Sequence, residues 1–293
     1  LIDVYEGKIS LDEFTAQLDD DDLIHLLGGQ PNTSVANTYG YGNLPEYGVP
    51  NIMTADGPAG LRITPQCEVC TTAWPCATLL ASTWNPALVE RVGTAGAEEV
   101  KENNIAVWLT PAVNIHRNPL CGRNFEYYSE DPFLSGKMAA AVVRGVQEEG
   151  TCGAVIKHFA CNNQEDNRMF TNAHISERAL REIYLKGFEI AVKESAPVAI
   201  MTSYNRVNGV HAANSRALCT VIAREEWGFD GVLMSDWSTT APEDGSIPWK
   251  CIEAGNDLIM PGSEKDDADI RQAYADGRLS EKEIRLCAGR IIS

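Results

Sequence analysis

The chain of 293 residues carries 41 acidic and 24 basic side chains, which gives a formal net charge of -17. This charge repels phosphate backbones and anionic membrane surfaces, and no basic patch interrupts it, so we expect neither a nucleic acid nor a membrane as a partner. No apolar run is long enough to span a membrane, and a neutral small molecule is the simplest ligand to expect.

The use of cysteine points to a reducing compartment. The nine cysteines are an odd number and are scattered along the chain, which suits a cytoplasmic protein better than a disulfide framework. Cys67-x-x-Cys70, with Cys76 nearby, has the spacing of a metal or redox site. No second pair at zinc-finger spacing accompanies it, so we do not expect a metal there.

The first 40 residues are expected to lead into the main domain, which covers residues 41–293. Residues 1–30 are acidic and carry a broken stripe of Leu and Phe, which predicts helices that end at the glycines 28 and 29. Residues 32–48 are rich in Asn, Thr, Tyr and Gly without periodicity, and we expect them to form an ordered surface loop.

Beyond this point, short apolar runs alternate with helical segments of about 10–20 residues, which is the pattern of repeated βα units. The apolar runs cover residues 51–55, 77–81, 105–110, 153–161, 197–203, 231–235 and 257–260. Helices are expected to begin at Asn85-Pro86, Asp131-Pro132, Ser176 and the capping box of Ser280 and Glu283. Seven strands, no obvious domain boundary and no nucleotide-binding glycine motif favour an α/β fold, a closed (β/α)₈ TIM-like barrel, over an open doubly wound sheet.

The apolar strand at residues 231–235 ends in Asp236 and Trp237. In parallel barrels the carboxyl ends of the strands carry the chemistry, so Asp236 is a candidate catalytic group. The alternative is that Asp236 caps a following helix.

Further candidate site residues lie at the ends of the other predicted strands and should gather on the same rim. They are the polar Asp56, Lys157, His158 and Tyr204 and the apolar Met201, with Arg123 and Arg168 in the intervening loops. Taken singly, Arg123, Lys157 and Arg168 are expected to pair with Glu126, Glu165 or Asp131 more often than to contact a substrate.

His158 allows more than one role. It could be a general base, or a neutral hydrogen-bond donor fixed in a polar wall. A zinc site would need further histidines from distant parts of the chain, and a serine hydrolase would need a Gly-x-Ser-x-Gly elbow that the sequence lacks. We therefore expect no metal and no cofactor.

A rim with carboxylates, cationic donors and exposed aromatic rings suits a sugar. Carboxylates accept from pairs of neighbouring hydroxyls, Lys and Arg donate to the same oxygens, and Trp237 offers a flat face to a pyranose ring. Breaking a glycosidic bond needs a nucleophilic or basic carboxylate and an acid for the leaving oxygen.

These motifs resemble the successive barrel motifs of glycoside hydrolase family 3, in its β-glucosidase branch. The similar segments are Asp56-Gly-Pro-Ala-Gly-Leu-Arg62, Gly122-Arg-Asn-Phe-Glu126 with Ser129-Glu-Asp-Pro132, Lys157-His-Phe159 with Asn162-Asn-Gln-Glu165 and Arg168, Met201-Thr-Ser-Tyr-Asn205 and Ser235-Asp-Trp237. They occur in order over residues 50–262, so the resemblance is specific.

The resemblance implies retaining hydrolysis of terminal, nonreducing β-D-glucosyl units from oligosaccharides or aryl glycosides. Asp236 would be the nucleophile, and Glu126 and Asp131 would support the site. The residues implied to surround the terminal sugar are Asp56, Arg123, Lys157, His158, Arg168, Met201, Tyr204 and Trp237.

In the hexosaminidase branch of the family, the acid/base is a His in a loop of the Lys-His-Phe-Pro-Gly-His-Gly type. Here Ala160-Cys-Asn-Asn163 follows Lys157-His-Phe159, as in the glucosidase branch. There the acid is a Glu on an α/β sandwich domain. We expect that domain, and hence the acid/base, to be absent from this chain and to be supplied by the rest of the protein or by a second chain. Two alternatives stay open: a β-xylosidase of the same family, and a noncatalytic sugar-binding barrel.

Overall fold

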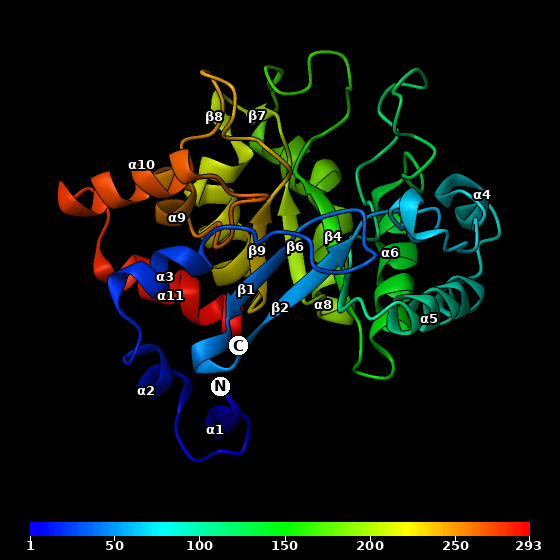
Figure 1. Ribbon diagram of the computed structural model, residues 1–293. Helices are drawn as coiled ribbons and strands as arrows, with labels where there is room; N and C mark the ends of the chain where they lie inside the picture. Colours follow the sequence, from blue (N-terminus) through cyan, green and yellow to red (C-terminus); the bar gives the residue numbers. More distant parts are fainter.

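The computed structural model describes residues 1–293, and its main sheet has six strands in the order β1-β2-β3-β4-β6-β9 (Figure 1). These strands are β1 (Gly40–Leu44), β2 (Val49–Ala55), β3 (Val107–Trp108), β4 (Gly153–Phe159), β6 (Ala199–Thr202) and β9 (Val232–Ser235). All neighbours from β2 to β9 pair in parallel, whereas β1 pairs antiparallel with β2. A second, small sheet contains β5 (Asn172–Ala173), β7 (Arg206–Val207) and β8 (Val210–His211).

Isolated bridges close the main sheet into a ring. Met234 of β9 pairs in parallel with Leu258, and the next residue, Ile259, pairs in parallel with Gly28. Gln30 then pairs antiparallel with Gly40 of β1. The six strands and these two segments together make the eight members of a TIM-like barrel, the fold that the sequence predicts.

Helices surround this barrel (Figure 1). They are α1 (Ile2–Tyr5), α2 (Leu11–Thr15), α3 (Asp20–Leu26), α4 (Ala77–Ala81), α5 (Pro86–Glu102), α6 (Pro132–Gln147), α7 (Glu177–Ala179), α8 (Lys186–Ser195), α9 (Pro248–Ala254), α10 (Glu264–Ala275) and α11 (Glu281–Ile292), with π-helical segments η3 (Leu180–Tyr184) and η5 (Ala217–Glu226). Short 3₁₀ turns are η1 (Pro45–Tyr47), η2 (Pro65–Cys67) and η4 (Ala212–Asn214). None of these helices has the length and apolarity to cross a bilayer.

The contact between α5 and α6 depends on glycine. A Cβ atom at Gly93 or at Gly145 would collide with a carbonyl oxygen of the facing helix, that of Val142 or of Glu90. The two backbones can therefore approach each other closely on the outside of the barrel.

Strand β4 shows how the barrel directs its side chains. All seven of its residues are buried, as expected for a parallel strand covered on both faces. Ala154 and Ile156 pack in the apolar cluster that includes α5, α6 and α8, whereas Val155 packs in the other cluster. The alternation along a strand then puts Lys157 on the same side as Val155, at the carboxyl end.

The predicted helix starts are confirmed. Asn85, Asp131 and Ser176 accept hydrogen bonds from the first turns of α5, α6 and α7, and Ser280 and Glu283 form the reciprocal capping box of α11.

Two predictions from the sequence are wrong. Residues 77–81 form helix α4 and not a strand, because Ala77, Leu80 and Ala81 are buried with helical spacing, which so short an apolar run does not reveal. Residues 32–48 are not simply a surface loop. They contain the buried strand β1, which the turn Pro45–Tyr47 and Gly48, at φ 73°, connect to β2.

A buried carboxylate fastens the ring to the outer helices. Asp257 is fully buried and pairs with Arg224 of η5 and, at 3.0 Å, with Arg290 of α11. It also accepts a hydrogen bond of 2.8 Å from the backbone N–H of Leu233 in β9. One side chain thus connects a barrel strand with two helices.

Replacing Asp257 by Asn should destabilise the protein by about 3–5 kcal/mol, because it leaves the buried Arg224 without an anionic partner. Urea unfolding of both proteins measures this loss. Asp230→Asn, at an exposed position, is the matched control and should change the free energy of unfolding by less than about 0.5 kcal/mol. Equal stability of the two variants would contradict this role of Asp257.

Candidate active site

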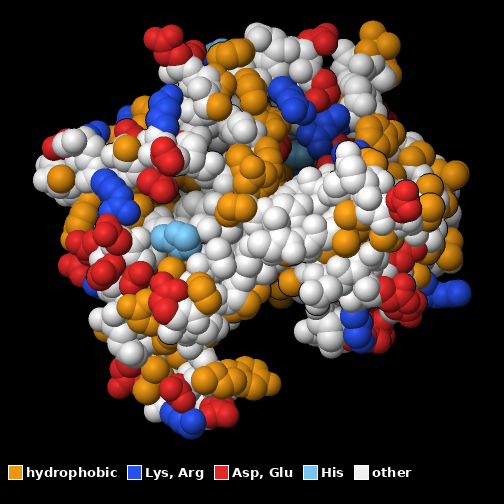
Figure 2. All heavy atoms as spheres, in the orientation of Figure 1, with side chains coloured by type: hydrophobic (Ala, Val, Ile, Leu, Met, Phe, Trp, Pro, Cys, Tyr) orange, Lys and Arg blue, Asp and Glu red, His pale blue; other side chains and the backbone are white.

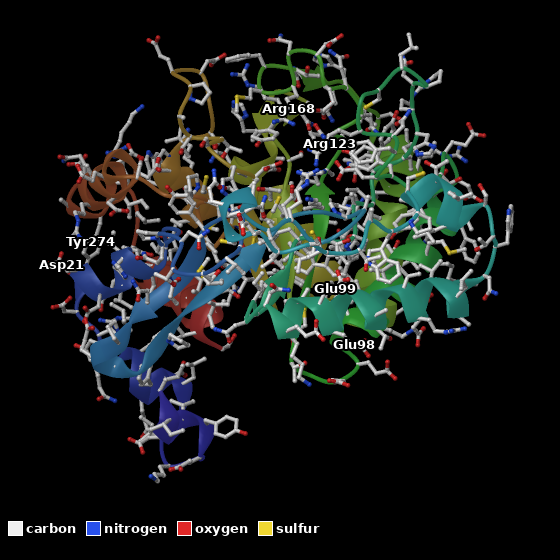
Figure 3. All side chains as sticks on the ribbon, turned by 45° about the vertical axis from the view of Figure 1, so that its right-hand side comes forward. Asp21, Glu98, Glu99, Arg123, Arg168 and Tyr274 are labelled. Carbon is white, nitrogen blue, oxygen red and sulfur yellow. The ribbon has the colours of Figure 1, made fainter.

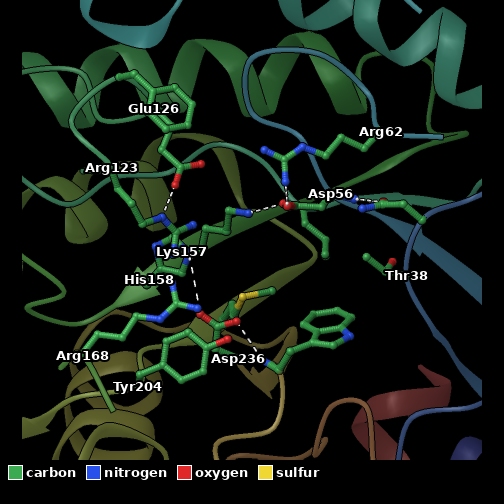
Figure 4. A pocket seen from close by; sticks show the side chains of 15 residues that line it. Thr38, Asp56, Arg62, Arg123, Glu126, Lys157, His158, Arg168, Tyr204 and Asp236 are labelled. Atoms are coloured by element: carbon green, nitrogen blue, oxygen red, sulfur yellow. Dashed lines mark hydrogen bonds and ion pairs between the residues drawn. The ribbon is translucent and has the colours of Figure 1, made fainter. Parts of the chain in front are cut away.

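The carboxyl ends of the barrel strands surround a pocket of about 390 Å³ (Figure 4). Its lining is Asn37, Thr38, Asp56, Arg62, Leu109, Arg123, Phe125, Glu126, Lys157, His158, Arg168, Met201, Tyr204, Asp236 and Trp237. All nine residues that the sequence suggests for a sugar site are among them. The structure therefore brings the predicted set together, although the chain separates its members by up to 181 positions, from 56 to 237.

The strands deliver these side chains directly. Asp56 follows the last residue of β2, Lys157 and His158 lie near the end of β4, and Met201 lies on β6. Asp236 follows the last residue of β9, as predicted.

The loops after β3 and β4 bring Arg123 and Arg168 over this rim. The two arginines lie near each other above the strands in Figure 3 and at one side of the pocket in Figure 4. In the space-filling view, Lys and Arg side chains gather at a hollow in the upper part of the molecule (Figure 2). A protein of net negative charge thus gathers four cationic side chains around this pocket, beside three carboxylates.

Two cations hold Asp56. Lys157 binds its Oδ1, and the Nη1 atom of Arg62 lies 2.9 Å from its Oδ2. The Oδ1 atom of Asn37 accepts a bond of 3.0 Å from the backbone N–H of Asp56. Burial pushes the pKa of Asp56 upward, but the charge and hydrogen bond of Lys157, with Arg62, outweigh it and lower the pKa to about 2. Asp56 is therefore ionised at neutral pH and can accept from ligand hydroxyls.

Asp236 has one free carboxylate oxygen. Its Oδ1 accepts a hydrogen bond of 2.7 Å from the backbone N–H of Trp237, whereas its buried Oδ2 has no hydrogen-bond partner. The next helix, α9, starts only at Pro248 with Ile247 at its N-cap. The alternative that Asp236 is a helix cap is therefore wrong.

Burial raises the pKa of Asp236, and the charges of Arg123 and Lys157 oppose this effect. The backbone around the carboxylate is fixed, because the N–H of Asp236 donates to the Thr202 carbonyl at 3.1 Å and the N–H of Ser235 donates to Leu258 at 2.8 Å. An unpaired oxygen on a fixed carboxylate can attack an electrophilic carbon or accept a proton.

His158 is a neutral member of the wall. Burial lowers its pKa well below the ordinary value, and the charges of Arg123 and Lys157 act in the same direction. Asn114 holds its backbone through two bonds of 2.8 Å, and the Tyr127 hydroxyl lies 3.3 Å from Nδ1. The Nε2 atom is 3.8 Å from Asp236 Oδ2, which leaves it available to a ligand hydroxyl.

The two arginines of the pocket each have a carboxylate partner. Arg123 pairs with the buried Glu126, and Arg168 pairs with Glu165 at 2.9 Å. The guanidinium of Arg168 also stacks on the ring of Tyr204, 4.3 Å from its centroid.

Asp131, the third carboxylate considered as an ion-pair partner, instead caps α6 through the N–H of Phe133 at 2.8 Å.

Sequence reasoning missed five of the lining residues as members of the site: Asn37, Thr38, Arg62, Leu109 and Phe125. Arg62 could have been found, because it closes the Asp56–Arg62 motif that the sequence analysis recognised. Asn37 and Thr38 lie in the segment interpreted as a surface loop and carry no pattern of their own.

The cysteines and histidines form no metal centre. No group of three or more His, Cys, Asp or Glu side chains is arranged to hold an ion. Cys67 and Cys70 are exposed and unpaired, and Cys76 is partly exposed.

The sequence of this chain is similar to those of known proteins. The N-terminal domain of glycosyl hydrolase family 3 matches residues 41–293. Beta-glucosidase A of Butyrivibrio fibrisolvens is 58% identical over 259 residues, which is 88% of this chain and 30% of that protein. An exo-alpha-(1->6)-L-arabinopyranosidase of Bifidobacterium breve is 46% identical over 254 residues, which is 83% of this chain and 33% of that protein.

A solved structure has the same fold. Beta-glucosidase 3B from Thermotoga neapolitana in complex with alpha-D-glucose superposes with a TM-score of 0.90 at 46% identity, over 96% of this chain and 42% of that one. The chain spans about a third of the length of the curated relatives it matches.

The ion pairs of Asp56 should make stability depend on pH. Its pKa is lowered from 3.8 to about 2, so its contribution is fully present above pH 3.8 and is lost as the pH falls toward 2. The difference in unfolding free energy between the parent and Asp56→Asn should therefore shrink by about 2 kcal/mol over this range. Urea unfolding from pH 5 to pH 2.5 measures it, with Asp230→Asn as control. A difference that does not change with pH would contradict the ion-pair account.

Proposed function

The chain belongs to glycoside hydrolase family 3, and from this premise we propose that it is the barrel domain of a retaining, exo-acting β-glucosidase. The observation that carries the proposal is the carboxylate of Asp236, with one unpaired oxygen in a pocket whose other walls suit sugar hydroxyls. The substrates would be terminal, nonreducing β-D-glucosyl units of oligosaccharides or aryl glycosides.

Asp236 would be the nucleophile. Its free Oδ2 would form a bond to the anomeric carbon while the bond from that carbon to the leaving oxygen breaks, which gives a covalent glycosyl ester. Water would then attack the same carbon and release Asp236. Two displacements at one carbon retain its configuration.

The other walls would hold the sugar ring. Asp56, kept ionised by Lys157 and Arg62, would accept from a pair of hydroxyls. Lys157 and the neutral His158 would donate to the same or adjacent oxygens.

On the side of the nucleophile, Arg123 and Arg168 would donate to sugar oxygens. Met201, Tyr204 and Trp237 would pack against the apolar faces of the ring. Arg62, which the sequence analysis did not propose as a site residue, joins the set through its contact with Asp56.

The acid that protonates the leaving oxygen would come from outside this chain. Within the pocket, Asp56 and Glu126 are engaged with cations, and the pKa of His158 is lowered. Because the chain spans about a third of its relatives, we propose that an α/β sandwich domain, in the same protein or in a second chain, supplies this acid/base.

A related substrate has a specific observation in its favour. Relatives at 46% identity are named exo-alpha-(1->6)-L-arabinopyranosidases. An L-arabinopyranosyl unit lacks the exocyclic carbon of glucose and has an axial hydroxyl at carbon 4. Comparing kcat/KM for an aryl β-D-glucoside, an aryl β-D-xyloside and an aryl α-L-arabinopyranoside separates these activities, and we expect the glucoside to be preferred.

A reducing compartment such as the cytoplasm suits the cysteine content. All nine cysteines are free thiols, and five of them are buried. We propose this location on the ground that the sequence gives, the odd number and the scattered positions of the cysteines.

The nucleophile assignment is tested by Asp236→Asn in the full-length protein. The amide keeps the size of the side chain but cannot attack the anomeric carbon, so kcat should fall by roughly three orders of magnitude or more while glucose binding stays comparable. Kinetics with an aryl β-glucoside and calorimetry with glucose measure the two quantities. Asp230→Asn, at an exposed position outside the pocket, is the control and should retain most of the activity. A kcat of Asp236→Asn within tenfold of the parent would refute the assignment and leave the noncatalytic alternative as the better one.

A further inference from the structure

A buried tyrosine behind the pocket contacts the histidine of the pocket wall. Tyr127 is fully buried and is not among the residues that line the pocket. Its hydroxyl lies 3.3 Å from the Nδ1 atom of His158, and the two rings pack edge to face with their centroids 6.1 Å apart. The other ring nitrogen, Nε2, lies 3.8 Å from Oδ2 of Asp236 (Figure 4). The Tyr127 hydroxyl therefore makes the only hydrogen bond that the protein offers to the His158 ring.

This contact bears on the position of the proton of His158. The neutral ring has two forms, with the proton on Nε2 or on Nδ1. With the proton on Nε2, the ring donates to a group in the pocket, whereas with the proton on Nδ1 it can only accept there. In the proposed function His158 donates to a sugar oxygen, which needs the form with the proton on Nε2. Because the pKa of His158 is lowered by burial, the ring is neutral and the two forms are the relevant ones.

A chain of hydrogen bonds with a fixed direction reaches Tyr127 from Arg168. The guanidinium of Arg168 can only donate, and it binds Oε2 of Glu165 at 2.9 Å. A carboxylate oxygen only accepts, so the side-chain atom of Asn162 that lies 3.2 Å from Oε1 of Glu165 is the donor Nδ2. The same Nδ2 atom lies 2.9 Å from the Tyr127 hydroxyl and donates its second hydrogen to it.

The Tyr127 oxygen thus accepts one hydrogen bond and has its own proton left to donate. Burial raises the pKa of Tyr127, so the hydroxyl keeps this proton. Two acceptors lie within its reach, His158 Nδ1 at 3.3 Å and the backbone oxygen of Asn162 at 3.2 Å. The charge of Asp236 favours the first, because a proton on Nε2 is attracted to the carboxylate, whereas a bare Nε2 presents a lone pair to it. With its proton on Nε2, the ring has Nδ1 free to accept from Tyr127.

From this geometry we infer that Tyr127 is a positioning residue, which donates to Nδ1 of His158 and so holds the proton of that ring on Nε2, where it is available to a sugar oxygen. The inference rests on the proposed function and adds to it a residue outside the lining of the pocket. Tyr127 contacts no substrate and acts through His158 alone. Loss of its hydroxyl leaves the buried Nδ1 without a donor, and the form that donates into the pocket loses its support.

The kinetic test is Tyr127→Phe in the full-length protein. The ring keeps its packing and only the hydroxyl is lost, so kcat/KM for an aryl β-glucoside should fall about three- to tenfold, the effect of one hydrogen bond to the sugar. Tyr128→Phe is the matched control, since Tyr128 is also buried but packs in an apolar cluster and makes no hydrogen bond through its hydroxyl. Its kcat/KM should stay within about twofold of the parent.

A double-mutant cycle with His158→Ala separates positioning from a purely structural role. Because Tyr127 acts through His158, Tyr127→Phe should change kcat/KM by less than about twofold once the imidazole is absent. The same three- to tenfold loss in both backgrounds would overturn the inference, since the hydroxyl would then support the pocket in another way. An unchanged kcat/KM after Tyr127→Phe alone would also overturn it.

Neutron diffraction from crystals of the deuterated full-length protein locates the protons directly and needs neither catalysis nor a variant that folds. It should show deuterium on Nε2 of His158 and the Tyr127 hydroxyl directed at Nδ1. Deuterium on Nδ1, or a hydroxyl directed at the Asn162 carbonyl, would refute the role of Tyr127. A parent protein that has the expected arrangement but hydrolyses no β-glucoside would refute the proposed function alone.

Discussion

The burial of Asp236 with one unpaired oxygen is the constraint on which the rest of the site depends. A carboxylate taken out of water loses solvation, and burial raises the pKa of Asp236. The charges of Arg123 and Lys157 and the hydrogen bond from the Trp237 N–H oppose this rise only in part, and no hydrogen bond reaches Oδ2. A direct ion pair would stabilise the anion better but would also occupy the atom that attacks the sugar in the proposed mechanism.

The same reasoning explains the ion pairs around the pocket. Each cation near Asp236 has a carboxylate of its own: Glu126 for Arg123, Asp56 for Lys157 and Glu165 for Arg168. These pairs keep the cations in place and moderate the positive field. They do not contact Oδ2, which stays without a hydrogen-bond partner in the lining of the pocket.

The barrel and most of the pocket could be predicted from the sequence because the end of a strand can be recognised in the sequence itself. An apolar run that stops at Asp56, Lys157 or Asp236 indicates both a strand and its functional end. Helix α4 and strand β1 could not be assigned in this way. Residues 77–81 are too few to distinguish a helical from an extended period. Strand β1 has a Gly-rich sequence whose pairing partners, Gln30 and the strand β2, lie elsewhere in the chain.

Residues that act through contacts between distant parts of the chain could not be recognised from the sequence either. Asn37 accepts a hydrogen bond from the backbone N–H of Asp56, which lies 19 positions away in the chain. The sequence around Asn37 contains no pattern that indicates this contact. Arg117 and Tyr184 are a pair of the same kind, since they are 67 positions apart and meet only in the folded protein. Sequence motifs identify the side chains at the ends of strands. Side chains that loops bring together can be identified only from the structure.

The central claim is that Asp236 bonds covalently to the sugar, and trapping that bond tests it most directly. A 2-deoxy-2-fluoro β-glucoside with an activated leaving group slows the release of the glycosyl ester, so the full-length protein can be digested and its peptides mapped by mass spectrometry. The account predicts a single label of the fluoroglucosyl mass on the peptide that contains Asp236, and none when glucose protects the pocket. A label on Asp56, Glu126 or Glu165, or an active enzyme with no label at all, would contradict it.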